Sequence, residues 1–402
     1  MNMNIKRLIR TFDLNKSIPP VMVGLVLEGI FILISLRVAE NFLIASEYSQ
    51  LTIVYSIISI LSFGLFAGLE QIRQSQRTDE FSLNKTIRYA LISLLCISPI
   101  LLFILIQLKI SILFSFLIFI SAFSYAIQFD FFGYLSHIKK PYSYAGLKVL
   151  DAGLKIFLVF SFGSLLQSFF AIVFAYSLAP LVALLLYLRL SNLNPSYKKT
   201  ISSKTKAYID LSILNFISLS YLYGLPLVNY LKDNETIYTA SNLFFGQAYS
   251  QVLQFTLAPI QFYFLPKLAK QYSKGENIKL SDIYRGFYMA AIVSIAYVVF
   301  TYIFGVRVIT YFFYNSFNLD EQETILIAMI SVLILLIKTS SFYLIAIRKT
   351  ELLGYTLLSS FLLLGAIVYF TQLNITFAFL LTCSFSLLII FYLNIKLITD
   401  DQ

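Results

Sequence analysis

Twelve long apolar runs alternate with short polar segments along the chain. Each run holds about 20 mostly apolar residues, the length that an α-helix needs to cross the hydrocarbon core of a bilayer. None shows the strict alternation of membrane β-strands, and isolated helices satisfy their own backbone hydrogen bonds in lipid. We therefore predict twelve transmembrane helices, at residues 18–38, 49–69, 87–108, 110–132, 147–166, 168–188, 208–231, 239–265, 283–305, 324–347, 352–372 and 375–395.

The polar segments suggest how these spans are organised. Residues 1–17 have one apolar helical face and an opposite face with Lys6, Arg7 and Arg10, a pattern typical of a helix lying in the membrane interface. The longest basic segment stands between spans six and seven. We predict an all-α integral membrane protein with an N-terminal six-helix bundle over 1–188, a cytoplasmic linker over 189–207 and a C-terminal six-helix bundle over 208–402.

The basic residues support this count of spans. If residue 1 lies in the cytoplasm, 24 of the 30 Lys and Arg residues fall in cytoplasmic segments and four fall on the outer side. This asymmetry follows the positive-inside rule. Both termini are therefore predicted to be cytoplasmic, and the net charge of +10 indicates basic loops rather than a nucleic-acid partner.

Composition excludes several classes of function. Of 402 residues, 59% are hydrophobic and 12% are charged, whereas soluble domains hold about 45–50% apolar and about 25% charged residues. The chain has one histidine, His137, two distant cysteines and no phosphate-binding G-x-x-x-x-G-K-[ST] loop. We expect no soluble enzyme, no ATP-driven pump on this chain alone, and no metal or cofactor. The segments between spans are short, so function is expected to reside among the helices.

A few charged residues fall inside the predicted spans. Glu28, Lys155 and Lys338 are the deepest, and Asp151 lies one helical turn before Lys155. Each charge near the bilayer centre costs about 2.5–3.5 kcal/mol unless it meets water or a partner. A water-filled cavity between the two bundles is one explanation. The alternative is pairing within the protein, of Glu28 with a lysine and of Asp151 with Lys155. Both remain open.

Amide side chains form a second polar feature. Four glutamines of the eighth span share one helical face, and we expect that face to meet a lumen or a neighbouring helix: Gln247, Gln251, Gln254 and Gln261. Asn215 in the seventh span is a weaker candidate of the same kind. Asp130 and Asp210 are expected near inner helix ends, where water is close.

Two segments carry a resemblance to a known family. The sequence ASEYSQ at 45–50 resembles the entry to the second span of bacterial polysaccharide-unit flippases, and LPKLAKQYSKGE at 265–276 is similar to the end of their eighth span. These flippases belong to the multidrug/oligosaccharidyl-lipid/polysaccharide (MOP) superfamily. With the twelve spans and short loops, the resemblance covers nearly the whole chain.

The resemblance implies a transporter of the bacterial inner membrane. It implies two six-helix bundles around a central cavity that opens alternately to each side. The implied substrate is an undecaprenyl-diphosphate-linked oligosaccharide, such as an O-antigen unit, and the implied partners are a polysaccharide polymerase and a chain-length regulator, with no enzymatic activity in the chain itself.

Residue roles follow from that implied substrate. Basic side chains are expected to compensate the diphosphate, and amides to meet sugar hydroxyls. We predict substrate-binding roles for Lys155, Lys338, Gln247, Gln251, Gln254 and Asn215. Glu28 and Asp151 are predicted to couple transport to an ion, since a carboxylate in a desolvated site can exchange a proton.

Two rival functions are kept. A drug or cation antiporter of the same superfamily would need a cavity dominated by carboxylates, against which the two lysines argue weakly. A polysaccharide polymerase or ligase also has many spans, but it needs a large outer loop with catalytic groups, and the outer loops here are short.

Overall fold

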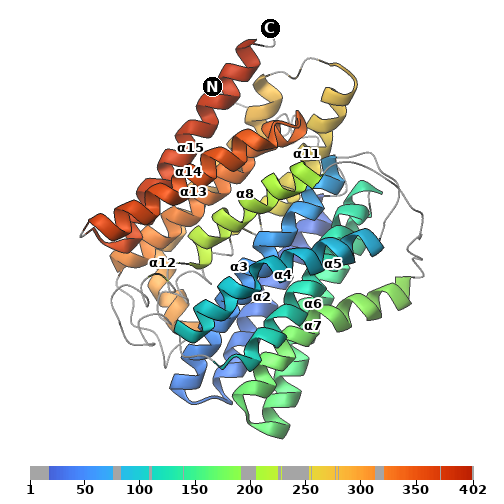
Figure 1. The fold of residues 1–402 in the computed structure, drawn as a ribbon, viewed down its shortest axis with the longest axis vertical. Helices are drawn as coiled ribbons and strands as arrows, with labels where there is room; N and C mark the ends of the chain where they lie inside the picture. Colours follow the sequence, from blue (N-terminus) through green and yellow to red (C-terminus); the bar gives the residue numbers. More distant parts are fainter. Residues whose placement is uncertain are drawn as a thin grey trace.

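The computed structural model describes most of the chain, and long helices dominate it (Figure 1). The predicted interfacial helix 1–17 falls outside the described residues, as do Gln247 and Gln251. The described residues are 18–75, 83–107, 111–138, 140–191, 205–224, 228, 253–254, 256–276, 278, 280–312, 321–371 and 373–400.

Twelve α-helices of 17 residues or more lie in these ranges. Nearly all the predicted spans coincide with one of them, with ends that differ by a few residues. The helices are α2 (Ile18–Glu40), α3 (Ala45–Ser75), α4 (Leu83–Gln107), α5 (Leu113–His137), α6 (Pro141–Leu166), α7 (Phe169–Ser191), α8 (Thr205–Tyr223), α11 (Leu257–Ser273), α12 (Leu280–Phe312), α13 (Glu321–Ala346), α14 (Thr350–Phe370) and α15 (Ile375–Asp400).

Ten of these helices are long and apolar enough to cross a membrane. The other two, α8 and α11, cover parts of the seventh and eighth predicted spans, whose remaining residues are mostly outside the described ranges. Several helices continue past the apolar run that identifies them. The helix α3 extends six residues beyond the predicted end at residue 69 because its polar end, from Glu70 onward, is satisfied by neighbouring helices. The chain is a multi-pass membrane protein.

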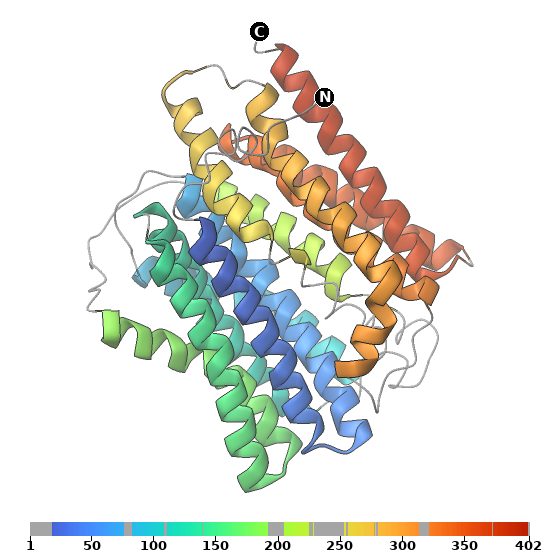
Figure 2. The same cartoon turned by 180° about the vertical axis from the view of Figure 1, so that it is seen from behind.

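The helices gather into two bundles, each with its own hydrophobic cluster (Figures 1 and 2). The first cluster comes from α2–α7, joined by Phe262 and Ile309. The second comes from α8 and α11–α15, joined by Ile60 of α3. Within the predicted linker 189–207, α7 continues to Ser191 and α8 begins at Thr205, and the residues between them fall outside the described ranges. The start of α2 and the end of α15 lie at the same end of the molecule (Figure 2).

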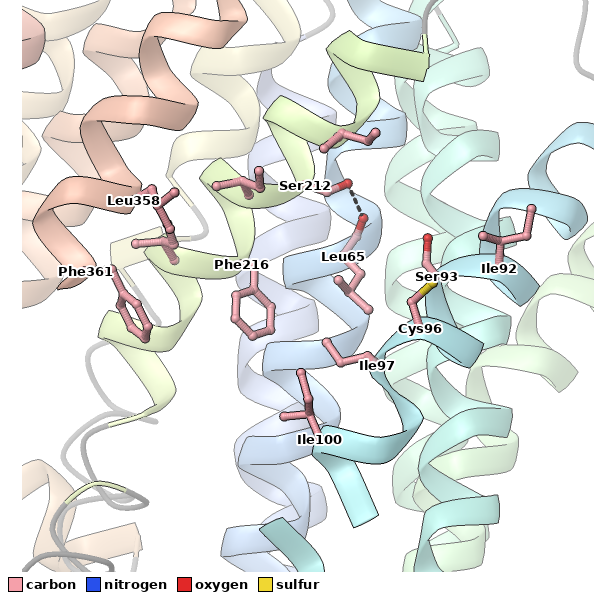
Figure 3. A pocket seen from close by; sticks show the side chains of 13 residues that line it. Leu65, Ile92, Ser93, Cys96, Ile97, Ile100, Ser212, Phe216, Leu358 and Phe361 are labelled. Carbon is pink, nitrogen blue, oxygen red and sulfur yellow. Dashed lines mark hydrogen bonds between the residues drawn. The ribbon is translucent and has the colours of Figure 1, made fainter. Parts of the chain in front are cut away.

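A close seam between α3 and α8 joins the two bundles. Gly64 and Gly68 have the small-xxx-small spacing that lets two membrane helices approach closely. A Cβ added at Gly64 would lie 2.9 Å from the Cα of Phe216, so the α8 backbone occupies the space that a side chain would need. The Ser212 hydroxyl donates to the Leu65 carbonyl across the seam at 2.8 Å (Figure 3). The two helices are therefore in close contact along this seam.

Candidate functional site

Four charged side chains form a buried cluster inside the N-terminal bundle. On α6, Lys155 Nζ lies 2.7 Å from Asp151 Oδ2 and donates to the hydroxyl of Tyr125 on α5 at 2.5 Å. Lys148 lies two helical turns before Lys155 on α6, and its Nζ is 3.4 Å from Glu28 Oε1 of α2. All four charged residues are at most 9% exposed. The pairing alternative raised by the sequence is therefore the arrangement found for Glu28, Asp151 and Lys155.

The two acids and two lysines of this cluster balance in charge, but each acid has one carboxylate oxygen without a hydrogen-bond partner among the described residues. These oxygens are Glu28 Oε2 and Asp151 Oδ1, and both are buried. Lys148 also lies over the ring of Phe132, 4.5 Å from its centroid. An ammonium is attracted to the face of an aromatic ring. The cluster can thus hold both lysines as cations while keeping two carboxylate oxygens free for a proton or a small cation.

A second polar feature is a series of hydrogen-bonded side chains that extends from the N-terminal bundle to the C-terminal bundle. Tyr144 of α6 donates to Glu70 Oε1 of α3 at 2.9 Å, and the Gln74 amide donates to the same oxygen at 3.0 Å. Gln261 of α11 then donates to Gln74 Oε1 at 2.8 Å. A further hydrogen bond between the bundles is donated by the Asn215 amide of α8 to Gln71 Oε1 of α3 at 3.0 Å. These contacts close the two bundles together near the end of α3.

A third buried polar feature lies within the N-terminal bundle and involves Arg73, the residue before Gln74 on α3. Asp130 of α5 is 2% exposed, accepts from Arg73 Nε of α3 at 2.5 Å and accepts from the Thr86 hydroxyl of α4. The expectation that Asp130 lies where water is close was wrong. Neighbouring helices cover this end of α5, so an arginine takes the place of solvent. The Asp210 side chain falls outside the described residues.

The described amides of the eighth span contact protein groups. Gln254 donates to the Ser331 carbonyl of α13 at 2.7 Å and to its hydroxyl at 3.0 Å, whereas Gln261 binds Gln74 of α3. Asn215 likewise bonds across the seam. All three residues therefore form hydrogen bonds between helices. Gln254 also keeps one buried carbonyl oxygen, Oε1, without a partner among the described residues.

Lys338 differs from the lysines of the N-terminal bundle. It stands in the middle of α13, 9% exposed. No ion pair or hydrogen bond joins it to any residue in the described ranges. Ser331 precedes it by seven residues on α13, which places both on one helical face. The C-terminal bundle therefore holds a buried lysine for which the described part of the chain supplies no counter-charge.

Sequence reasoning missed several members of these groups. Lys148 stands at the very start of the predicted span 147–166, where a lysine can reach water, but α6 already starts at Pro141 and buries it. Glu70 and Gln74 lie beyond the apolar run of α3, yet their i, i+4 spacing already placed them on one helical face. The central cavity expected around the predicted residues stays a prediction.

Comparison with known proteins identifies the fold. No protein-family model matches the chain, and a search of curated protein sequences finds no match. Solved structures do match over nearly the full length. A MATE transporter in the straight conformation has a TM-score of 0.68 at 14% identity, covering 96% of each chain. An outward-facing multidrug resistance MATE family transporter of the MOP superfamily has a TM-score of 0.66 at 14% identity, covering 96% of this chain and 99% of that one.

A third solved structure shows the same fold with a different site. It is a MOP superfamily transporter from Pyrococcus furiosus, for which a binding pocket of reverse polarity suggests a different function. Its TM-score is 0.59 at 13% identity, and the match covers 96% of this chain and 99% of that one. The chain therefore has the twelve-helix, two-bundle fold of MOP superfamily transporters.

Proposed function

We propose that this chain is a transporter that moves an undecaprenyl-diphosphate-linked oligosaccharide across the bacterial inner membrane by alternating access of its two bundles. The fold shared with MOP superfamily transporters supports the transport class. The sequence resemblance to polysaccharide-unit flippases supports the substrate. In this proposal both termini are cytoplasmic, and a polysaccharide polymerase and a chain-length regulator act on the product outside.

The observation that carries the proposal is Lys338. A lysine buried in a membrane helix costs about 2.5–3.5 kcal/mol unless it is partnered, and this lysine has no acid among the described residues. A diphosphate headgroup would supply the counter-charge. Lys155 is already bonded to Asp151 and Tyr125, so its predicted contact with substrate would require that pair to open.

The amides fit a sugar-bearing substrate. Gln254 is tied to Ser331 on the face of α13 that carries Lys338, and its unpartnered oxygen can accept from a sugar hydroxyl. Gln247 and Gln251 keep the same proposed role. Asn215 would need to release Gln71 to contribute, which would happen when the bundles separate.

Ion coupling is proposed for the cluster in the N-terminal bundle. The free carboxylate oxygens of Glu28 and Asp151 are the sites for a proton or a small cation. Protonating Glu28 would leave Lys148 uncompensated, so protonation of this acid would be coupled to the packing of α2 against α6. Protonating Asp151 would leave Lys155 uncompensated within α6. Collapse of the proton gradient is expected to slow transport if Glu28 couples protons, and Glu28→Gln is expected to remove that dependence. Transport that is indifferent to the gradient would reject the proton as the coupled ion.

The test uses proteoliposomes that contain the full chain and a fluorescent polyprenyl-diphosphate oligosaccharide. Appearance of the glycan on the opposite leaflet is followed with a membrane-impermeant quencher. Lys338→Ala is expected to lower the apparent affinity about 10- to 150-fold, since a hydrogen bond to a charged group contributes about 1.5–3 kcal/mol. Lys338→Arg is expected to retain much of the activity. Lys349→Ala is the control, because Lys349 is an exposed lysine just past the end of α13.

Transport by Lys338→Ala at the rate of the Lys349→Ala control would remove Lys338 from the mechanism. Absence of flipping by the unaltered protein would contradict the proposed substrate. In both cases the amount of folded protein is checked by gel filtration.

A drug or cation antiporter is the second candidate, favoured by the two carboxylates with unpartnered oxygens in the N-terminal bundle. Two of the compared structures belong to MATE transporters. This candidate predicts efflux of a lipophilic cation from the same proteoliposomes, abolished by Asp151→Asn and retained by Lys338→Ala. The flippase proposal predicts no such efflux.

A further inference from the structure

One buried lysine of the N-terminal bundle lies near two buried acids on different helices. Lys148 Nζ of α6 is 3.4 Å from Glu28 Oε1 of α2, and its positive charge also acts on Glu70 of α3. Glu70 is 6% exposed and accepts hydrogen bonds from two neutral side chains, Tyr144 and Gln74. Among the described residues, no cation forms an ion pair with Glu70. Lys148 is therefore a cation that can compensate either carboxylate.

The surroundings of Lys148 hold its ammonium loosely. The 3.4 Å contact with Glu28 is longer than the about 2.7–2.9 Å of a strong charge-assisted hydrogen bond. Nζ also lies 4.5 Å from the ring centroid of Phe132 and 5.7 Å from that of Phe129, both on α5. Aromatic faces attract an ammonium without a directed hydrogen bond, and the lysine stem is flexible. Lys148 can therefore turn between the two acids without leaving the aromatic rings.

The same rings extend from Lys148 to the C-terminal bundle. Phe132 packs against Tyr144 with ring centroids 5.0 Å apart, and Tyr144 stands one helical turn before Lys148 on α6. Tyr144 in turn packs edge-on against Phe262 of α11, with centroids 5.6 Å apart. Its hydroxyl is one of the two donors to Glu70 Oε1. Lys148 is thus next to the side chains that join α3 and α6 to α11.

The second donor to Glu70 forms the hydrogen bond that reaches α11. The Gln74 amide donates to Glu70 Oε1 at 3.0 Å, and Gln74 Oε1 accepts from Gln261 of α11 at 2.8 Å. An amide group is planar, so fixing its nitrogen also fixes its oxygen. The bond from Gln74 to Glu70 therefore orients the oxygen that Gln261 binds. We call this pair of bonds the α3–α11 contact.

The groups around Glu28 show which of them responds when this acid is neutralised. Charged and titratable side chains come from α6 and α3, and among the described residues α11 adds none: Tyr144, Lys148, Asp151 and Lys155 of α6, and Tyr55 and Glu70 of α3. Asp151 and Lys155 are bonded to each other at 2.7 Å. Lys148 is therefore the cation that loses its partner when Glu28 takes up a proton or a small cation.

We propose that Lys148 transmits the occupancy of Glu28 to the α3–α11 contact. The inference rests on the ion coupling proposed above for Glu28. While Glu28 is ionised, Lys148 stays beside it and Glu70 keeps its neutral donors. Once Glu28 is neutralised, the Lys148 ammonium turns to Glu70. Its charge-assisted hydrogen bond is about twice as strong as a neutral one, so it displaces the Gln74 amide and the α3–α11 contact opens. Lys148 is a positioning residue that acts through Glu70.

The test measures the distance between the bundles by double electron–electron resonance, on the full chain in lipid nanodiscs. Spin labels are attached at Tyr142→Cys, near the start of α6 and 76% exposed, and at Tyr272→Cys on α11, 43% exposed. The exposed native thiol is removed by Cys96→Ala. Glu28→Gln imitates the neutral acid and is expected to add a longer distance population. Glu40→Gln is the matched control on α2, because Glu40 is ion-paired with Arg37 and is expected to leave the distances unchanged.

A second substitution tests whether Lys148 is the link. Glu28→Gln combined with Lys148→Met removes both charges, and we expect the longer population to disappear. Glu28→Gln combined with Lys148→Arg is expected to keep it, because a cation can still reach Glu70. The proposal is overturned if the longer population persists with Lys148→Met, or if Glu28→Gln gives the same distances as Glu40→Gln. A purely structural role for Lys148 would leave the effect of Glu28→Gln in place.

Acidification gives a measurement that needs no substitution of Glu28, so it holds even where Glu28→Gln yields no folded protein. Protonation of Glu28 releases Lys148, so the longer population is expected to grow as the pH falls in the labelled chain. With Lys148→Met it is expected to stay constant over the same pH range. Equal growth in both proteins would overturn the proposal.

Failure of this inference differs from failure of the proposed function, because the distance measurement contains no substrate. If the distances depend on Lys148 but transport is indifferent to the proton gradient, the link from Glu28 to the α3–α11 contact stands and the proposed coupling to protons is wrong. If transport depends on the gradient but the distances do not depend on Lys148, the coupling stands and the link is wrong.

Discussion

The buried pair of Asp151 and Lys155 allows a quantitative test of the electrostatics of the N-terminal bundle. Their side chains are 2% and 3% exposed, and the 2.7 Å contact is reinforced by the Tyr125 hydroxyl. Removing one partner of a buried ion pair costs about 3–5 kcal/mol, because the other charge is left uncompensated. For Asp151→Asn we expect the lower part of this range, since Tyr125 still accepts from the lysine.

Replacing both partners with apolar residues removes both charges. The double variant carries Asp151→Leu and Lys155→Met. Its loss in free energy of unfolding is expected to be far smaller than the summed losses of Asp151→Leu and Lys155→Met made singly, so its stability should be close to that of the unaltered protein. The free energy of unfolding is measured for all four proteins in mixed detergent micelles by titration with sodium dodecyl sulfate.

A surface pair in the same chain provides the control. Lys274 and Glu276 lie 3.4 Å apart with side chains 49% and 52% exposed, and exposed pairs contribute about 0–1 kcal/mol. Lys274→Met is expected to change the free energy of unfolding by no more than that. If Asp151→Asn costs as little as Lys274→Met, or if the double variant costs as much as the two single variants added, the reasoning about the buried pair is refuted.

Three further changes test the contacts between helices. Gly64→Ala is expected to destabilise the α3–α8 seam by about 1–3 kcal/mol, measured in the same unfolding assay, because the added methyl group would lie 2.9 Å from an α8 Cα atom. Gln261→Met removes the bond to Gln74; we expect the bundles to separate more often near the end of α3, seen as a broader spin-label distance distribution. Asp130→Asn weakens the contact with Arg73 and is expected to cost about 3–5 kcal/mol, tested by unfolding.

Much of the architecture could be predicted from hydropathy. Twelve spans and their approximate ends follow from the length of apolar run that a bilayer requires, and the described helices coincide with nearly all of them. Hydropathy alone does not set the ends of the helices, because a membrane helix continues as long as its polar residues find partners. The polar end of α3 illustrates this, since Glu70 and Gln74 are bonded to other helices.

The candidate site was predictable only as a set of residue types. The sequence identified Glu28, Asp151, Lys155 and Lys338 as costly charges, because any charge deep in a membrane requires compensation. It could not tell which charges compensate each other, since partners such as Lys148 and Glu28 are 120 residues apart in the chain. Only Asp151 and Lys155, one helical turn apart, were readable as a pair in advance.

By itself, the sequence determined that this chain is a membrane-embedded helical bundle with a small number of buried charges, because hydrophobic length and the cost of desolvation are local properties. The tertiary structure alone decided that Lys155 is neutralised by a neighbour while Lys338 has no counter-charge among the described residues, and that Lys148 of α6 pairs with Glu28 of α2. Those properties depend on which helices pack together, and helices surrounded by lipid choose their neighbours through shape and polar contacts spread over the whole chain.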